Sequence, residues 1–281
     1  MKKLIISLAA AASLSLSAQP TVLYKISGNG LAKPSYVYGT IHVTCDATLE
    51  PSTIEAMKNT SQLYLELDMD DPGMQMAMMQ GMTMEDGKTL QSMVSDEDWK
   101  KLDAVVKAKL GVSATMLNTV KPFFLSTMFL PSLLDCPMKS IEGSLMTLAK
   151  EQQEEVYGLE TLAEQMAVFD KIPYDVQMAE LMESVRDNFA SSKAEMKELM
   201  AVYRSKNLEI MKKLIETSDN RITAEHQEAL LFTRNRNWIP RIEKIAKEKP
   251  TFFGVGAGHL PGAQGVLALL RERGYTVEPV Q

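Results

Sequence analysis

The chain has 281 residues, with 30 Lys and Arg against 36 Asp and Glu, which gives a formal net charge of −6. A hydrophobic fraction of 45% is ordinary for a globular protein and argues against a disordered chain. Because no basic stripe accompanies this acidic balance, the composition gives no reason to expect nucleic acid as a partner.

The N-terminus has the pattern of a secretory signal peptide. Lys2 and Lys3 precede an apolar run over 4–16, which small residues follow. This run is too short to span a bilayer as a mature helix. We therefore predict a signal peptide over 1–18, a mature chain over 19–281 with no membrane span, and a periplasmic or secreted location.

The two cysteines, Cys45 and Cys136, fit such an oxidising compartment. An even number of cysteines in an exported protein favours one disulfide between them. Two alternatives remain open at this point. Cys45 lies three residues after His42 and is a candidate metal ligand, or both thiols are free and buried.

The first part of the chain predicts strands and a short helix. Apolar residues mixed with turn formers predict adjacent strands over 22–26 and 35–38. A helix is expected over 51–59 and a further strand over 62–67. The succession of strand, helix and strand favours a parallel sheet.

The middle of the chain is mostly helical in pattern. Apolar residues recur at helical spacing over 88–110, after Lys121, over 143–150 and over 173–216. A core strand is expected over 155–158. We interpret this region as a helical lobe inserted into an α/β core.

Seven methionines lie between Met69 and Met84. This stretch predicts an adaptable apolar surface on a cap helix or loop. The alternative is soft-metal binding through thioethers. It is disfavoured because such sites usually pair methionine with a nearby histidine, and this stretch has none.

The C-terminal part repeats the strand and helix pattern. A strand is expected over 251–255, a helix through 266–270 and a final strand over 275–280. The whole pattern predicts an α/β fold with a mostly parallel central sheet flanked by helices. We expect 19–281 to form a single domain that carries the helical insertion.

Two of the three histidines lie in Gly-x-x-His segments, which end in His42 and His259. Each segment follows a predicted strand, and Glu66 lies in a third. Because the carboxyl ends of parallel strands share one edge of a sheet, these three side chains should converge there. Two imidazoles and a carboxylate suit a small metal or acid–base site. The alternative is that both histidines are buried and satisfied by backbone hydrogen bonds.

The third histidine and two nearby polar residues belong to one predicted helix. His226 stands at the start of this amphipathic helix, and we predict a surface or structural role for it. Arg234 and Asn235 interrupt the apolar run that follows. They belong to a solvated helix face, or Arg234 reaches the crevice and holds a carboxylate of Glu66, Glu160 or a substrate.

Several separate motifs carry a resemblance to the TraB/GumN family, which includes the PrgY and TIKI proteins. They are GTIH, LYLEL, VYGLETLAEQ, LLFTRNRNWIPRI and FFGVGAGHLPGAQGVLALLRERGYTVEPV, and together they cover nearly the whole mature chain. The resemblance implies a relationship to TIKI-type metal-dependent proteases. In those proteins two Gly-x-x-His motifs and a glutamate are regarded as the active site.

Carried over to this sequence, the resemblance implies His42, His259 and Glu66 as the active-site residues. It also implies Glu160 and Arg234 as supporting residues. One departure is visible at Glu142, where many relatives have aspartate. The acidic group is kept there, but it is one methylene longer.

Our first hypothesis is an exported metal-dependent hydrolase that resembles a peptidase. His42, His259 and Glu66 would bind a divalent ion such as Mn, Co or Zn, with Glu66 as third ligand or general base. The second hypothesis is a non-catalytic protein that captures a peptide or a small exported ligand in the same crevice. A third is a metal-free acid–base enzyme that uses His42 and Glu66.

Overall fold

The structure is a computed structural model that describes residues 19–281, so the predicted signal peptide lies outside the described residues. In this part of the chain six strands form one sheet in the order β4–β3–β5–β2–β1–β6. Strands β4, β3, β5 and β2 pair in parallel, whereas β1 is antiparallel to β2 and β6. The predicted α/β fold with a mostly parallel sheet is confirmed. The strands are β1 (Leu23–Ser27), β2 (Ser35–Thr40), β3 (Leu63–Leu65), β4 (Val156–Gly158), β5 (Phe252–Gly256) and β6 (Thr276–Pro279).

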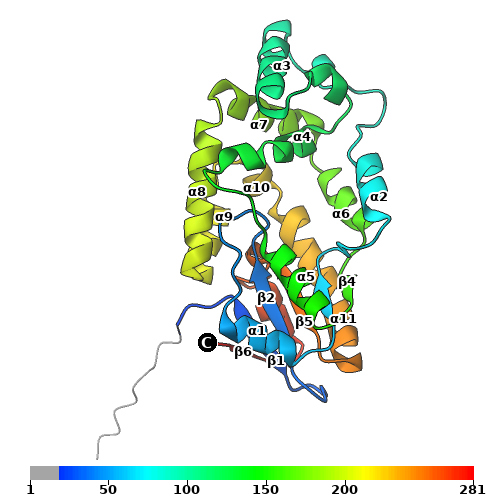
Figure 1. Ribbon diagram of the computed structural model, residues 1–281, viewed down its shortest axis with the longest axis vertical. Helices are drawn as coiled ribbons and strands as arrows, with labels where there is room; N and C mark the ends of the chain where they lie inside the picture. Colours follow the sequence, from blue (N-terminus) through cyan, green and yellow to red (C-terminus); the bar gives the residue numbers. More distant parts are fainter. Residues whose placement is uncertain (1–18) are drawn as a thin grey trace, which may run out of the picture.

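Helices cover both faces of this sheet (Figure 1). Right-handed crossovers between parallel strands place α1 and α5 on one face and α11 and α12 on the other. Both layers contribute to one core, in which β5 is buried along most of its length. The covering helices are α1 (Pro51–Lys58), α5 (Ile141–Glu151), α11 (Thr233–Glu248) and α12 (Val266–Glu272).

The remaining helices form a lobe, in which α3, α4 and α7 gather at the end of the molecule farthest from the sheet (Figure 1). The lobe has a hydrophobic core of its own, with Leu102, Leu125, Phe129 and Leu181 fully or almost fully buried. One core thus lies in the α/β body and another in the lobe. That residues 19–281 form a single domain stays a prediction. The lobe elements are α2 (Met74–Gly81), η1 (Gln91–Met93), α3 (Asp96–Leu110), η2 (Ala114–Leu117), α4 (Pro122–Met128), η3 (Leu130–Leu133), α6 (Leu162–Phe169), α7 (Tyr174–Arg186), α8 (Ala190–Ser205), α9 (Leu208–Glu216) and α10 (Arg221–Glu225).

Two segments differ in detail from the sequence expectation. The helical region over 173–216 is divided into α7, α8 and α9, because Phe189 and Lys206 take left-handed backbone angles, with φ of 64° and 54°. The strand expected over 62–67 ends at Leu65, so Glu66 follows it directly. Among residues 19–281, no helix combines the length and the apolar character needed to cross a bilayer.

Candidate functional site

Four neighbouring parallel strands end at one edge of the sheet, and a chemically useful residue follows each of them. Glu160 follows β4, Glu66 follows β3, His259 lies in the short helix η5 (Ala257–His259) after β5, and His42 follows β2. Ligands collect at this edge in open parallel sheets. The register therefore explains why residues distant in sequence lie side by side.

Gly256 marks the point around which three of these side chains gather. A Cβ atom at this position would lie 3.1 Å from Glu66 Oε1, 3.6 Å from His259 Cδ2 and 3.9 Å from His42 Nε2. The Gly256 amide donates to Glu66 Oε1 at 2.7 Å, and that oxygen is 3.6 Å from His259 Nε2. The second Gly-x-x-His motif thus needs glycine here because a side chain would enter the site.

The ring of His259 is buried and held on both nitrogens. Its Nδ1 lies 2.6 Å from Asn235 Oδ1, and its Nε2 lies 3.1 Å from Arg234 Nη1. A guanidinium only donates hydrogen bonds, so Nε2 of His259 must accept from Arg234. The ring proton is therefore on Nδ1, which donates to Asn235 Oδ1. Burial and the positive charge of Arg234 outweigh the effect of Glu66 and lower the pKa of His259 to about 3. This imidazole is therefore neutral.

His42 is oriented by an acidic partner. Its Nδ1 lies 2.7 Å from Glu142 Oε1. The His42 side chain is 65% exposed to solvent. Glu142 Oε1 faces this nitrogen at ion-pair distance, whereas the buried Oε2 has no donor among the described residues. Desolvation lowers the pKa of His42, but Glu142 and the charge of Glu66 outweigh it, so the pKa lies above its usual value.

Arg234 joins the two carboxylates at the centre of the site. Its Nε and Nη2 donate to Glu160 at 3.1 and 2.6 Å, and Nη2 also donates to Glu66 Oε2. Gln165 and Trp238 add donors to Glu160 at 3.1 and 3.0 Å. Burial would raise the pKa of Glu66, but the charge of Arg234 outweighs burial and lowers it to about 2. Glu66 is therefore ionised.

A change of helix type precedes Arg234. The segment η4 (Glu228–Phe232) is a π-helix that leads directly into α11. The carbonyl of Leu230 in this segment accepts from Arg234 Nη1 at 3.0 Å. π-helical turns are frequent at functional sites. Within α11 the buried Arg234 and Asn235 face the site, whereas Arg236 is exposed.

The donor set has the chemistry of a metal site. Each imidazole is fixed through Nδ1 by an oxygen, which is how metal-binding histidines are oriented. The buried Oε2 of Glu142, which has no donor among the described residues, would favour a cation nearby. As the side chains stand within residues 19–281, no three His, Cys, Asp or Glu groups lie close enough to hold a metal. Arg234 Nη1 occupies His259 Nε2, the nitrogen that would bind an ion. Binding of an ion by His42, His259 and Glu66 therefore requires this contact to open.

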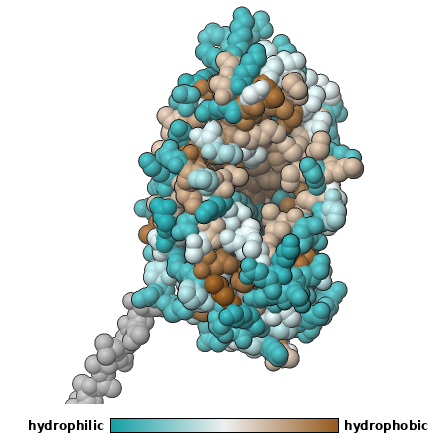
Figure 2. All heavy atoms as spheres, viewed as in Figure 1, coloured by the Kyte–Doolittle hydropathy of each residue, from teal (hydrophilic) through white to brown (hydrophobic). Residues whose placement is uncertain are grey.

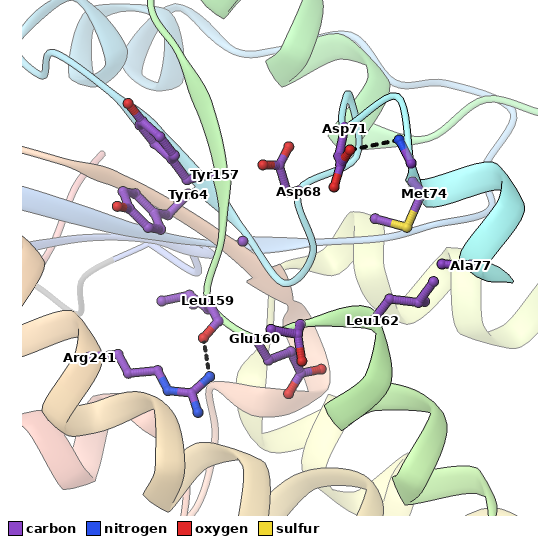
Figure 3. A pocket seen from close by; sticks show the side chains of 13 residues that line it. Tyr64, Asp68, Asp71, Met74, Ala77, Tyr157, Leu159, Glu160, Leu162 and Arg241 are labelled. Carbon is purple, nitrogen blue, oxygen red and sulfur yellow. Dashed lines mark hydrogen bonds between the residues drawn. The ribbon is translucent and has the colours of Figure 1, made fainter. Parts of the chain in front are cut away.

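Two cavities lie beside the site. One of about 330 Å³ is lined by His42, Glu66 and Met78, among others. The other, of about 700 Å³, includes Glu160 and Arg241 in its wall (Figure 3). On the face seen in Figure 2, a hollow with a largely apolar wall opens between the lobe and the α/β body. The site is therefore reachable by a ligand.

Other candidates lie apart from this cluster. The structure joins Cys45 and Cys136 in a disulfide with a Cα–Cα distance of 5.7 Å, so Cys45 has no thiolate to offer a metal. The His226 side chain forms no hydrogen bond or ion pair with the cluster in the described chain, and its Nε2 is buried without a hydrogen-bond partner there.

Sequence reasoning missed Gln165 and Trp238 and left the role of Glu142 in doubt. A signal for Trp238 existed, because it lies four residues after Arg234 and so on the same helix face. Gln165 had a weaker signal, since it ends the VYGLETLAEQ segment that contains Glu160. No spacing rule connects Glu142 to His42, because the pair depends on tertiary structure.

Comparisons with known proteins show the family of the chain. The chain is 23% identical to "Metalloprotease TIKI2" of Danio rerio over a 301-residue alignment, which covers 87% of this chain and 58% of that protein. It is 22% identical to "Metalloprotease TIKI1" of Danio rerio over 300 residues, which cover 87% and 60%. The chain thus spans about three fifths of the length of these curated relatives. No solved structure matches it. The model of the TraB/PrgY/gumN family matches residues 22–279, and the chain belongs to that family, as its motifs predicted.

Proposed function

We propose that this chain is an exported metal-dependent hydrolase that cleaves peptide bonds at the site of His42, Glu66 and His259. The observation that carries the proposal is the orientation of both imidazoles around an ionised carboxylate at the ligand-binding edge of the sheet. The distant relationship to proteins named metalloproteases supports it. A bound divalent ion, Mn, Co or Zn, would supply an activated water.

The residues of the chain divide the remaining work. His42 and His259 would hold the ion, and Glu66 would serve as third ligand or as general base. Arg234 keeps Glu66 ionised and in place, and Glu160 holds the guanidinium of Arg234. The disulfide and the predicted signal peptide agree with action in the periplasm or outside the cell.

Metal content and peptide turnover of the mature chain test this proposal. The chain from residue 19 onward is stripped with a chelator, reloaded with Mn, Co or Zn, and given a random peptide library. We expect His42→Ala and His259→Ala to lose both metal and cleavage. His226→Ala is the matched control because it removes the histidine outside the cluster, and it should keep both. If the two site variants retain metal and any peptidase activity, the proposal is wrong.

One observation favours a second candidate, a non-catalytic protein that binds a peptide or small exported ligand. Arg234 contacts both Glu66 and His259 directly and so satisfies them with a side chain of the protein itself. This function predicts no metal and no cleavage, but peptide binding that requires both His42 and His259. The same variants and library separate it from the hydrolase.

A further inference from the structure

The wall of the cavity of about 330 Å³ beside the candidate site combines polar and apolar side chains. Its polar members are His42, Glu66, Glu142 and Gln165, which include two of the residues that would hold the metal. The rest of its wall is apolar and comes from the end of β3 and from the methionine-rich stretch. This apolar part consists of Leu65, Leu67, Met69, Met74 and Met78.

The methionines of this wall are not used to build the protein core. Helix α2 has no buried residue, and Met69 and Met78 are 47% and 37% exposed although they line the cavity. Met74 also lines the larger neighbouring cavity (Figure 3). Apolar side chains grouped and exposed next to a polar site indicate a surface for a ligand.

We propose that Leu67, Met69, Met74 and Met78 form a subsite for one apolar side chain of the peptide substrate, next to the bond presented to His42 and Glu66. The cavity lies at the lower end of ligand-pocket volumes, which suits one side chain better than a whole ligand. The role of this subsite in cleavage rests on the proposed function, whereas its binding of an apolar side chain does not.

The chemistry of the wall sets which side chains it accepts. A lysine or aspartate placed against the methionines would lose hydration, and the methionine side chains offer it no charged partner in return. Methionine side chains are unbranched and adapt their shape. The subsite should therefore accept leucine, methionine and phenylalanine alike and reject charged residues.

Two neighbouring methionines of α2 provide a matched test. Met78 lines the cavity, whereas Met79 is 68% exposed and lines neither cavity beside the site. Cleavage of a random peptide library by the metal-loaded wild type, Met78→Asp and Met79→Asp is mapped by mass spectrometry. Binding of Gly-Ser peptides with one central leucine or lysine is measured in parallel by fluorescence anisotropy.

The wild type should prefer leucine over lysine at one position by about tenfold or more. Met78→Asp should lose most of this preference and gain acceptance of lysine, because it adds a carboxylate to the wall. Met79→Asp should keep the wild-type profile. Acceptance of lysine by Met78→Asp alone could not be explained by a folding defect. Cleavage without a side-chain preference, or equal changes in both variants, would overturn the subsite but leave the hydrolase standing. Binding that prefers leucine and depends on Met78, with no cleavage, would support the subsite and contradict the hydrolase.

Discussion

Arg234 and His259 are in direct contact, with 3.1 Å between Nη1 of the guanidinium and Nε2 of the imidazole. The same guanidinium pairs with Glu66 and Glu160, and all four groups are buried. Arg234 therefore has two effects. Its positive charge lowers the pKa of Glu66 and pairs with Glu160, and its Nη1 takes the lone pair that a metal would need on His259.

Replacing Arg234 by methionine should destabilise the metal-free protein strongly. The variant leaves Glu66 and Glu160 buried without a positive partner, and breaking a buried ion pair in this way costs about 3–5 kcal/mol. Denaturant unfolding measures the loss. Arg236→Met is the control, because Arg236 is exposed and pairs with Glu228 at the surface, where such pairs contribute at most about 1 kcal/mol. Equal losses in the two variants would contradict the compensating role of Arg234.

Replacing Asn235 by leucine should weaken metal binding. Asn235 Oδ1 accepts a hydrogen bond from Nδ1–H of His259, which keeps the proton on Nδ1 and leaves Nε2 unprotonated. Loss of such a partner costs about 10–100-fold in metal affinity. Titration of the chelator-treated protein with Zn²⁺ gives the affinity. Asn237→Leu changes an exposed amide on the same helix and should leave the affinity unchanged. An Asn235→Leu variant that binds the ion as the wild type does would show that this partner is not needed.

Gly256→Ala should impair turnover more than stability. The new methyl group would lie 3.1 Å from Glu66 Oε1 and push this carboxylate aside, and since a misplacement of about 1 Å can reduce turnover by about 100-fold, we expect a loss of up to that size. Overpacking of this kind costs about 1–3 kcal/mol, which unfolding experiments measure. Gly258→Ala is the control in the same motif, because its methyl group would meet the flexible end of Ile215. The prediction is wrong if both variants keep full peptide cleavage.

The convergence of the cluster could be predicted because it depends on sheet geometry alone. Once His42, Glu66 and His259 stand at the ends of parallel strands, one edge of the sheet brings them together. The parallel arrangement itself was visible as strand, helix and strand. Local pattern and one topological rule were sufficient for this part.

What could not be predicted depends on contacts between distant segments or on rare backbone states. The pairing of His42 with Glu142 requires the packing of α5 against the β2 end, which no periodicity reports. Phe189 and Lys206 take left-handed angles without being glycine, so no glycine marks the divisions between α7, α8 and α9, and only Asn188, with φ of 55°, is a residue type typical of such an end. The methionine-rich stretch contains no histidine, but the fold brings His42 into the wall of the cavity that Met69, Met74 and Met78 also line.

The disulfide connects the two segments that carry His42 and Glu142. Cys45 follows the first Gly-x-x-His motif and Cys136 precedes α5, at a sequence separation of 91 residues. Between the bonded cysteines and the site, Ile141 donates its amide proton to the Ile41 carbonyl at 3.1 Å. The covalent link and this backbone hydrogen bond together keep the histidine beside its carboxylate.

Removing the disulfide should therefore lower stability and loosen the site at once. A loop of this length predicts a loss of about 2–5 kcal/mol in the free energy of unfolding, chiefly because the unfolded chain gains freedom. The double variant Cys45→Ala with Cys136→Ala and the reduced wild type should show the same loss in denaturant unfolding. Both should also bind Zn²⁺ less tightly than the oxidised wild type, because the position of His42 relative to Glu142 is less restricted. Agreement between the two forms separates loss of the bond from any effect of the alanines. An unchanged unfolding free energy after complete reduction would show that packing alone holds these segments together.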